Sequence, residues 1–539
     1  MYGGIFLTKQ KKSRTGLTKK NAAYSIINRI VTLVCNFICR SVFINILGGE
    51  YLGAGGMFGN VFAVLSLAEL GFGEAVSQSL YKPLAEDDAD SICRIMRYFA
   101  KVYRMIGLVT VALCTAVMPF LPSIFSDIEK IERYRAVYLL FAVHQVLSYY
   151  FAPKRALVMC DQRMYAIMAF HTVSSVLMTV AQVVFLYLTN SYLIYIFLRI
   201  FFLALDGFAV NAYADRVYPF LVKCAQNTAL PVNTAYKAHV WKSTRSLILH
   251  RIGGVINSST DSILISSHLG LAHMGVFSNY SLIIHSLGSF VALAVGAASA
   301  SIGNLGVTES NEKSIRVLRL ISFGNFVLLT NCAALLINLI GSFITLWIGA
   351  KHLFGMAETA VIIACFYMSY IRDPVQIYLH SYGVFKSTGY LYLARGILNL
   401  VLSLAFVKQF GAVGVFAGTL VSTVVTAFFF EPPLLFRLAF GMSPKKFMKE
   451  YFFYPVATFI ICAVTWFAVY RFEVGNFVDL AGKGVVVFGI CNFLILLFFG
   501  GSKRFKAFLN LIFGRKGIKK RQEILPLFCI ERRCSGENF

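Results

Sequence analysis

About 14 apolar stretches, each about 20 residues long, follow one another along this chain of 539 residues. A helix of that length spans the hydrocarbon core of a bilayer, because each residue adds about 1.5 Å and the core is about 30 Å thick. Charged residues make up 14% of the chain, against about 25% in soluble domains, and the mean hydropathy is +0.70. The sequence therefore predicts an all-α, polytopic membrane protein.

The charges of the loops predict the orientation of these spans. Cytoplasmic loops hold an excess of Lys and Arg, and an N-terminus inside the cell places most of the 50 such residues on that side. The first stretch carries two arginines and no small-residue cleavage site, so we expect it to remain as a span. Both termini are predicted to be cytoplasmic. The expected spans are, approximately, 22–47, 52–80, 103–122, 136–153, 164–188, 192–213, 246–268, 274–301, 318–347, 356–378, 388–407, 411–430, 451–470 and 484–501.

Two parts of the chain match each other in order and in spacing. Arg29-Ile30 is followed 18 residues later by Leu47-Gly48, and Arg251-Ile252 is followed at the same interval by Leu269-Gly270. Shortly afterwards, GMFGN at 56–60 matches GVFSN at 275–279. These matches predict two pseudo-repeated lobes of six helices. The expected domains are a basic N-terminus at 1–21, an N-lobe at 22–225, a C-lobe at 226–447, two additional helices at 448–501 and a basic tail at 502–539.

Polar side chains form a stripe along the first span of each lobe. Arg29, Asn36 and Arg40 fall within about 40° on a helical wheel. The matching helix aligns Thr244, Arg251, Ser258 and Ser262 in the same way. An arginine at the middle of a bilayer costs roughly 3 kcal/mol, so we expect both stripes to line a hydrated cavity between the lobes. For Arg29 alone, extension of the side chain to the membrane surface is an equal alternative.

Other ionisable groups within the spans are candidates for ion coupling. They are Glu69, Glu74, Asp206, Asp261 and His250, and Arg395 is a further candidate for substrate binding. Asp206 lies two turns from Arg199. Two interpretations remain open: each carboxylate neutralises an arginine, or some of them bind H+ or Na+ during transport.

Several kinds of site are not expected. The nucleotide-binding pattern GxxxxGK[ST] is absent, and no CxxC pair occurs among the 12 cysteines. The predicted external loops are too short to hold a catalytic domain. We therefore predict no enzyme activity, no catalytic residues, no bound metal, no cofactor and no nucleic-acid partner. The cytoplasmic segment KPLAEDDADSICRIMRYFAKVYR predicts a turn in which an Asp caps the helix that enters the third span.

The run LGGEYLGAGGMFGNVFAVLSLAELGFGEAVSQSLYKPLAEDD, residues 47–88, resembles the region joining the first three spans of Wzx-type polysaccharide flippases. These belong to the superfamily that also holds the lipid II flippases and the multidrug and toxin extruders. The resemblance implies alternating access, a bacterial cytoplasmic membrane and an oligosaccharide linked to undecaprenyl pyrophosphate as substrate. It also implies membrane lipids and the polysaccharide polymerase machinery as partners. On this interpretation Arg29, Arg40 and Arg251 hold the diphosphate.

Two other functions remain as alternatives. An ion-coupled multidrug exporter of the same superfamily would need an acidic site for organic cations, whereas the stripe on the first span is basic. A membrane polysaccharide polymerase would need a sizeable external loop with catalytic Arg or His, which the predicted loops do not supply. The positioned arginines therefore favour the flippase.

Overall fold

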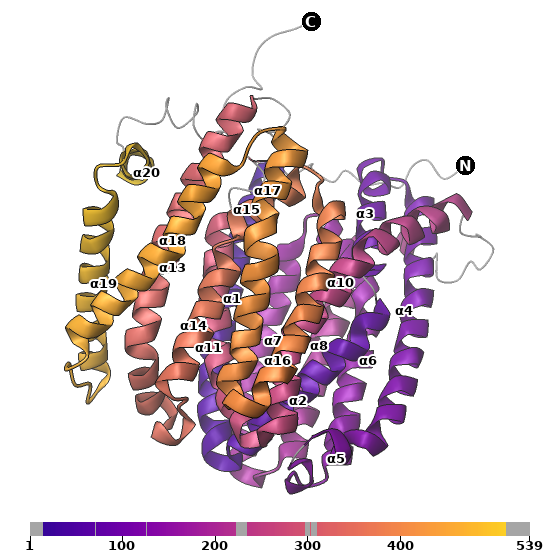
Figure 1. The fold of residues 1–539 in the computed structure, drawn as a ribbon. Coiled ribbons are helices and arrows are strands. Elements are labelled where there is room, and N and C mark those ends of the chain that lie inside the picture. The colour runs from indigo at the N-terminus through magenta and orange to yellow at the C-terminus, as the bar shows by residue number, and fades with distance from the viewer. Residues whose placement is uncertain are drawn as a thin grey trace, which may run out of the picture. The chain divides into compact units, whose positions relative to one another are not determined.

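The computed structural model describes residues 14–69, 72–125, 127–221, 234–296, 302 and 310–513. Every regular element among these residues is a helix (Figure 1). Two compact units make up the chain, residues 1–251 and 252–539. Ten of the described helices are long and apolar enough to cross a membrane. The predicted fold class is thus confirmed: the chain is an all-α, multi-pass membrane protein.

The first unit contains the following elements up to the boundary, which falls within α10: α1 Arg14–Leu47, α2 Gly49–Leu65, η1 Ser66–Glu69, α3 Phe72–Ala85, α4 Ala89–Val117, η2 Met118–Phe120, α5 Leu121–Ile124, η3 Ile128–Lys130, α6 Tyr134–Cys160, α7 Met164–Thr189, α8 Tyr192–Val217 and α10 Thr234–His268. The second unit continues with α11 Gly270–Gly296, α13 Asn311–Ile348, η4 Ala350–His352, α14 Met356–Tyr370, α15 Asp373–Ser381, α16 Phe385–Ser422, α17 Phe429–Leu435, α18 Lys445–Val469, α19 Phe477–Phe499 and α20 Lys503–Phe513. π-Helical turns at Thr423–Phe428 and Phe436–Phe440 flank α17.

The spans found by length and hydropathy differ from the sequence prediction at four places. The second predicted span is interrupted between α2 and α3, where a 3-10 turn at Ser66–Glu69 precedes the glycine-containing sequence LGFG. The tenth is divided between α14 and α15 ahead of Pro374. The eleventh and twelfth are joined within 388–440, with a kink at Gly411. The seventh predicted span, in α10, is not among the helices that are apolar enough to cross a membrane, because its sequence mixes polar and apolar residues.

Matching features recur in the two units at an interval of 222 residues. Gly48, after α1, and Gly270, where α11 begins, have φ values of 91° and 87°. Residues with a Cβ avoid this region, so glycine permits the sharp turn between the first two spans of each repeat. Asp88 accepts a hydrogen bond from the backbone N–H of Ser91 at 3.0 Å, and Ser310 accepts one from Lys313 at 3.4 Å. The predicted Asp cap is confirmed, and its counterpart begins α13.

Polar and aromatic side chains join the helices of the first unit. The Asn28 side-chain amide on α1 donates to the Thr172 hydroxyl on α7 at 2.9 Å and lies 3.1 Å from Nδ1 of His171. Such bonds hold apolar helices together where burial of apolar surface gives no driving force in lipid. Between α3, α4 and α6, buried side chains that include Phe72, Phe99 and Tyr103 form the core.

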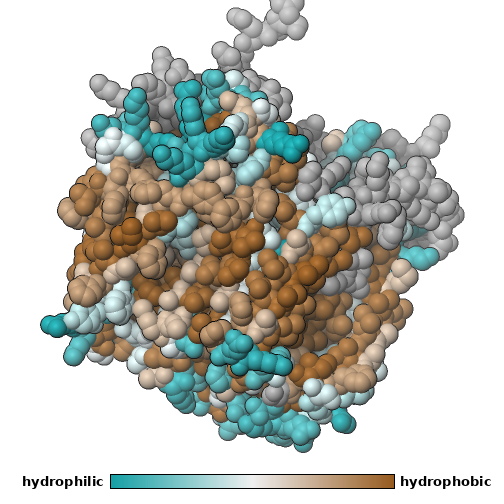
Figure 2. Space-filling model, viewed as in Figure 1, coloured by the Kyte–Doolittle hydropathy of each residue, from teal (hydrophilic) through white to brown (hydrophobic). Residues whose placement is uncertain are grey.

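Small residues and polar pairs join the helices of the second unit. Gly253 on α10 lies against the backbone of Tyr392 on α16, and Gly396 on α16 faces the carbonyl of Gly253. Three side-chain pairs fasten α13 to the last two spans: Thr330 with Thr458 at 2.7 Å, Asn338 with Thr465 at 3.2 Å and Asn331 with Asn492 at 2.9 Å. Hydrophobic side chains cover much of the outward surface of these spans (Figure 2).

Candidate functional site

The predicted polar stripe lies on α1, which continues without interruption from Arg14 to Leu47. Arg29 and Asn36 are exposed and Arg40 is half-buried. The adjoining face of the helix packs against the rest of the unit through Asn28 and Cys39. Arg29 and Asn36 therefore lie on the exposed side of a helix that is long and apolar enough to cross a membrane, and Arg40 is partly covered.

The interrupted second span carries two acidic groups, Glu69 and Glu74, that meet side chains of other helices. Glu69 accepts a hydrogen bond from the Tyr103 hydroxyl on α4. Glu74, in the first turn of α3, lies 3.6 Å from the guanidinium of Arg251, and the two side chains are 53% and 55% exposed. An ion pair this open to solvent contributes little to stability, so the Arg251 guanidinium remains accessible to an anion.

Asp206 is paired with an arginine that the sequence prediction did not name. Its carboxylate accepts a hydrogen bond from Arg155 on α6, rather than meeting Arg199 on its own helix. Asp206 is 4% exposed and Arg155 33% exposed. A second pair, Lys154 with Asp215 at 2.6 Å, also joins α6 to α8. Of the two interpretations, neutralisation of an arginine fits Asp206, because this acid lies against an arginine of a neighbouring helix.

Asp261 lies in an oxygen-rich cluster within the second unit. The Thr419 hydroxyl donates to Oδ1 of Asp261 at 2.6 Å, and its oxygen lies 2.9 Å from Oδ1 of Asn399. Ser403 donates to the same Asn399 oxygen at 3.0 Å. Carboxylate, amide and hydroxyl oxygens are the donors that hard cations prefer. The cluster thus brings together four oxygen-bearing side chains, and the one acid among them accepts a hydrogen bond from a neutral hydroxyl.

A buried ion pair joins Arg372, which precedes α15, to Glu431 on α17. Arg372 donates to Glu431 from Nε at 3.0 Å and from Nη2 at 2.5 Å, and the two side chains are 2% and 1% exposed. Arg395 is half-buried beside them, and its guanidinium lies 5.2 Å from the Tyr392 ring centroid. The Nε atom of Arg395 is buried without a hydrogen-bond partner among the described residues. The site predicted at Arg395 therefore contains an arginine that retains hydrogen-bonding capacity.

The remaining predicted site residues differ in burial. Ser258 is exposed, Ser262 is buried and His250 is half-buried. Thr244 has a side chain outside the described residues. Thr419, Ser403 and Arg155, together with the buried pair Arg372–Glu431, were missed because their contacts join segments that are far apart in the sequence. Polar side chains within apolar runs of the sequence could have identified these residues as candidates.

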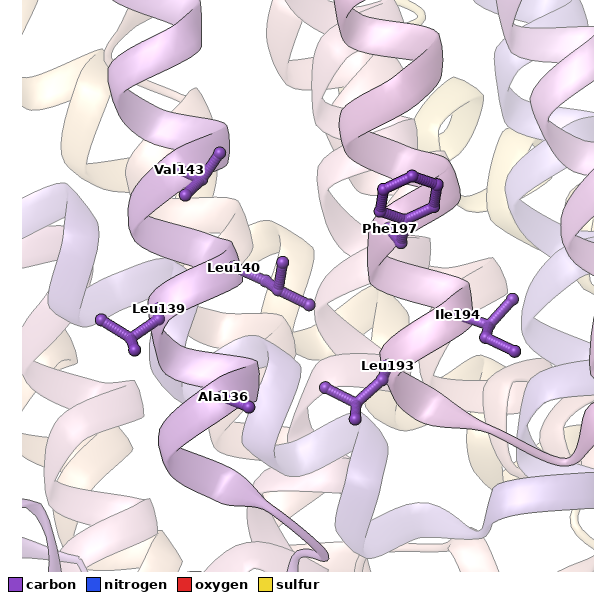
Figure 3. A pocket seen from close by; sticks show the side chains of 7 residues that line it. All are labelled: Ala136, Leu139, Leu140, Val143, Leu193, Ile194 and Phe197. Atoms are coloured by element: carbon purple, nitrogen blue, oxygen red, sulfur yellow. The ribbon is translucent and has the colours of Figure 1, made fainter.

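An apolar groove lies between α6 and α8 of the first unit (Figure 3). Its volume is about 410 Å³, and it is lined by Ala136, Leu139, Leu140, Val143, Leu193, Ile194 and Phe197. No charged or hydrogen-bonding side chain belongs to this lining. A diphosphate or a sugar would lose its hydration there without replacement, so the groove does not suit a polar headgroup.

Solved structures of transporters share this fold. The lipid II flippase MurJ in an inward closed conformation superposes with a TM-score of 0.60 at 13% identity, covering 89% of this chain and 98% of that one. The MATE multidrug transporter DinF-BH gives 0.57 at 17% identity, covering 80% and 99%. An inward-facing multidrug resistance MATE family transporter of the MOP superfamily gives 0.54 at 14% identity, covering 74% and 95%.

No protein-family model and no curated protein matches the sequence. At identities of 13% to 17% the structural likeness establishes the fold and leaves substrate and partners open. A lipid flippase and multidrug transporters share this fold, so the fold by itself assigns neither function.

Proposed function

We propose that this protein is a flippase that moves an oligosaccharide linked to undecaprenyl pyrophosphate from the cytoplasmic to the outer leaflet by alternating access. The observation that supports this most is the polar stripe of Arg29, Asn36 and Arg40 along α1, in which Arg29 and Asn36 are exposed and Arg40 is half-buried. Guanidinium groups on a membrane-spanning helix are costly unless an anion or water meets them. A lipid diphosphate is an anion that reaches this depth, because its polyprenyl tail stays in the bilayer.

The chemistry of the arginines suits a diphosphate better than a neutral or cationic solute. Each guanidinium offers planar, paired N–H donors that match two phosphate oxygens, and it keeps its charge at all working pH values. In our proposal Arg29, Arg40 and Arg251 bind the diphosphate, while Asn36 and Ser258 donate to the first sugar or to phosphate. Arg395 is the corresponding candidate in the second unit.

For the energy source, we propose that Asp261 binds the coupling ion, H+ or Na+. A proton would neutralise its carboxylate, and Na+ would be held by oxygens of Asp261, Asn399 and Thr419, whose positions support either ion. Glu69, Glu74, Asp206 and His250 are weaker candidates. Glu69 and Asp206 already have protein partners, and Glu74 lies beside Arg251.

A multidrug exporter is the second candidate function. Glu74 favours it, because a carboxylate that is 53% exposed could attract an organic cation. Arg251 at 3.6 Å opposes it, since the neighbouring positive charge repels such a substrate. The fold is compatible with both functions.

The decisive experiment is a flipping assay in proteoliposomes that contain a fluorescent polyprenyl-pyrophosphate-linked oligosaccharide. We expect the variant Arg29→Ala/Arg40→Ala/Arg251→Ala to lose at least about 90% of the flipping rate while keeping the helical circular dichroism spectrum, because each lost phosphate contact weakens binding by about tenfold or more. The matched control, Arg133→Ala/Arg135→Ala/Arg471→Ala, removes three exposed arginines from loops or helix starts and should flip at the normal rate.

Two outcomes would contradict the proposal. Near-normal flipping by the triple variant of α1 and α10 would remove the arginines from the mechanism. Absence of flipping by the unaltered protein, together with gradient-driven export of an organic cation from the same vesicles, would establish the exporter instead.

A further inference from the structure

Exposed basic side chains gather at one end of the second unit. They come from the first turns of α13, the π-helical turn after α17, the start of α18 and the start of α20: Arg316, Arg437, Lys445, Lys446, Lys449, Lys503 and Lys506. We call this set the basic surface. Hydrogen bonding connects its parts, because the side-chain amide of Asn311 on α13 donates to the Phe440 carbonyl at 3.1 Å. Glu312 is an exposed acid at the same end of α13.

The short helix α20 has one apolar and one basic side. Its sequence is KRFKAFLNLIF. The rings of Phe505 and Phe508 lie 6.3 and 5.7 Å from the ring of Phe323 on α13, and Phe508 also packs over Gly324. Lys503 and Lys506 are exposed. In Figure 1, α20 is seen nearly end-on beside the end of α19 and lies across the direction of that helix. This arrangement is typical of helices that lie in a membrane interface.

A partly buried acid, Glu450, joins α20 to α18 and α13. Glu450 on α18 accepts a hydrogen bond from Arg504 on α20 and lies 3.8 Å from Nε of Arg319 on α13. Its side chain is 23% exposed. The carboxylate thus serves two arginines at the junction of three helices. It helps to fix the position of α20, which carries Lys503 and Lys506 of the basic surface.

The position of the basic surface along the helices places it at the level of lipid headgroups. α18 and α19 are both long and apolar enough to cross a membrane. The lysines stand in the first turns of α18 and directly after the end of α19, where these two spans leave the hydrocarbon. Exposed apolar side chains border them: Leu438, Met442, Phe453 and Phe498 are 49%, 43%, 47% and 46% exposed. Figure 2 shows hydrophilic side chains at this end and hydrophobic ones along the spans.

We propose that the basic surface binds the anionic headgroups of bilayer phospholipids. Lysines beside a rim of exposed apolar side chains fit a phospholipid, whose phosphate and acyl chains are joined, and they fit a soluble polyanion less well because the rim would stay in water. A single phosphate attracts each Lys near the membrane surface, and the attraction weakens with salt. The inference goes beyond the transported substrate, because it concerns the lipid that surrounds the protein, and it stands whichever molecule is transported.

The test measures lipid binding to the purified full chain in neutral detergent by native mass spectrometry. The variant Lys445→Gln/Lys446→Gln/Lys449→Gln/Lys503→Gln/Lys506→Gln removes five charges from the basic surface. The control Lys130→Gln/Arg133→Gln/Arg135→Gln/Lys351→Gln/Arg471→Gln removes five exposed charges elsewhere. We expect bound phosphatidylglycerol to fall at least about tenfold in the first variant and to stay unchanged in the control. Phosphatidylcholine should bind equally to all three proteins.

Further arms of the experiment identify the ligand. Inorganic phosphate at the same concentration should not displace phosphatidylglycerol, and high salt should weaken its binding. Equal phosphatidylglycerol binding by the first variant and the unaltered protein would overturn the proposal, and so would displacement by inorganic phosphate. If the variant with five substitutions fails to fold, the double variants Lys445→Gln/Lys446→Gln and Lys503→Gln/Lys506→Gln should each lower the amount of bound phosphatidylglycerol. Because the readout is lipid binding, failure here leaves the flippase proposal untouched.

Discussion

Cys39 in the first unit and Asp261 in the second occupy equivalent positions of the repeat, each ten residues after its arginine, Arg29 or Arg251. The Cys39 thiol faces Gln182 at 3.4 Å and the Tyr195 hydroxyl at 3.7 Å. The Asp261 carboxylate faces Thr419 at 2.6 Å. In both units the partners come from the helices that correspond to the fifth and sixth spans of a repeat.

The difference shows how one scaffold separates two tasks. A neutral thiol offers no charge to a cation, whereas a carboxylate in the same place is able to bind a cation or a proton. Arg29 of the first unit is exposed on α1, whereas the Arg372–Glu431 pair of the second unit is buried. Duplication of the helices thus supplied two similar frames, and single side chains distinguish substrate binding from ion binding in our proposal.

Breaking the enclosed ion pair of the second unit should have the largest effect. Glu431→Gln leaves Arg372 charged and buried, so we expect a loss of about 3–5 kcal/mol in the free energy of unfolding. The counterpart in the first unit, Asp206→Asn, should cost about 2 kcal/mol because Arg155 is partly exposed. Thermal melting in detergent, monitored by circular dichroism, measures both. Equal shifts would show that enclosure does not distinguish the two units.

Close helix contact in the second unit gives the next largest effect. A methyl group at Gly253 would meet the backbone of Tyr392, whereas at the adjacent Gly254 it would meet nothing within 4 Å. We expect Gly253→Ala to destabilise by about 1–3 kcal/mol through overpacking. Gly254→Ala should stabilise by up to about 1 kcal/mol through helix propensity. The same melting experiment compares the two variants, and destabilisation of equal size would show that the contact with α16 is not close.

Ion dependence provides the third comparison. Asp261→Asn should reduce stimulation of transport by an imposed H+ or Na+ gradient at least about tenfold, which corresponds to about 1.4 kcal/mol. Cys39→Ser, the equivalent change in the first unit, should leave that stimulation unchanged because no charge is lost. Flux in proteoliposomes with each gradient applied separately measures both. Gradient-stimulated transport by Asp261→Asn at the normal level would move the coupling ion to another residue.

The helix caps give the smallest effect and a dependence on pH. Hydrogen bonds from the side chain and backbone of Ser91 lower the pKa of Asp88 below its ordinary value of 3.8. The cap therefore stabilises α4 above that pH, and its contribution is lost as pH falls through the lowered pKa.

Asp88→Ala should cost about 1 kcal/mol at pH 7 and very little at about pH 2. The counterpart Ser310→Ala should cost a similar amount at both pH values, because a hydroxyl does not titrate in this range. Denaturant unfolding at the two pH values measures the difference. A pH-independent cost for Asp88→Ala would show that the carboxylate does not provide the cap.

Local patterns of the sequence predicted those features that depend on neighbouring residues. The apolar runs predicted the membrane-spanning helices, the Arg–Ile and Leu–Gly matches predicted the duplication, and the acidic turn predicted the cap now seen at Asp88. The interruptions near Glu69 and before Asp373 were not predicted, because hydropathy does not detect a change of backbone conformation within an apolar run.

Tertiary contacts account for the rest. Asp206 lies two turns from Arg199 in sequence, yet its partner Arg155 comes from α6. The Asp261 cluster takes Thr419 from a position 158 residues away. A helical wheel shows which side chains share one face of a helix. It does not show which helix packs against that face, because this depends on the packing of the whole unit. The candidate residues could thus be found from sequence, whereas their partners could not.

The side-chain pairs between α13 and the last two spans have a consequence for synthesis. Thr330 and Thr458 lie 128 positions apart, and Asn331 and Asn492 lie 161 positions apart. At about 5–20 residues per second, the ribosome completes the partners roughly 6 to 30 s after α13. Until then, polar groups of α13 must be held in water, in the insertion machinery or against temporary neighbours, because hydrocarbon offers them no hydrogen bonds. The polar groups of α13 therefore gain their hydrogen-bond partners only when the last two spans are made. A chain that stops before these spans leaves those groups unpaired, and we expect it to be degraded.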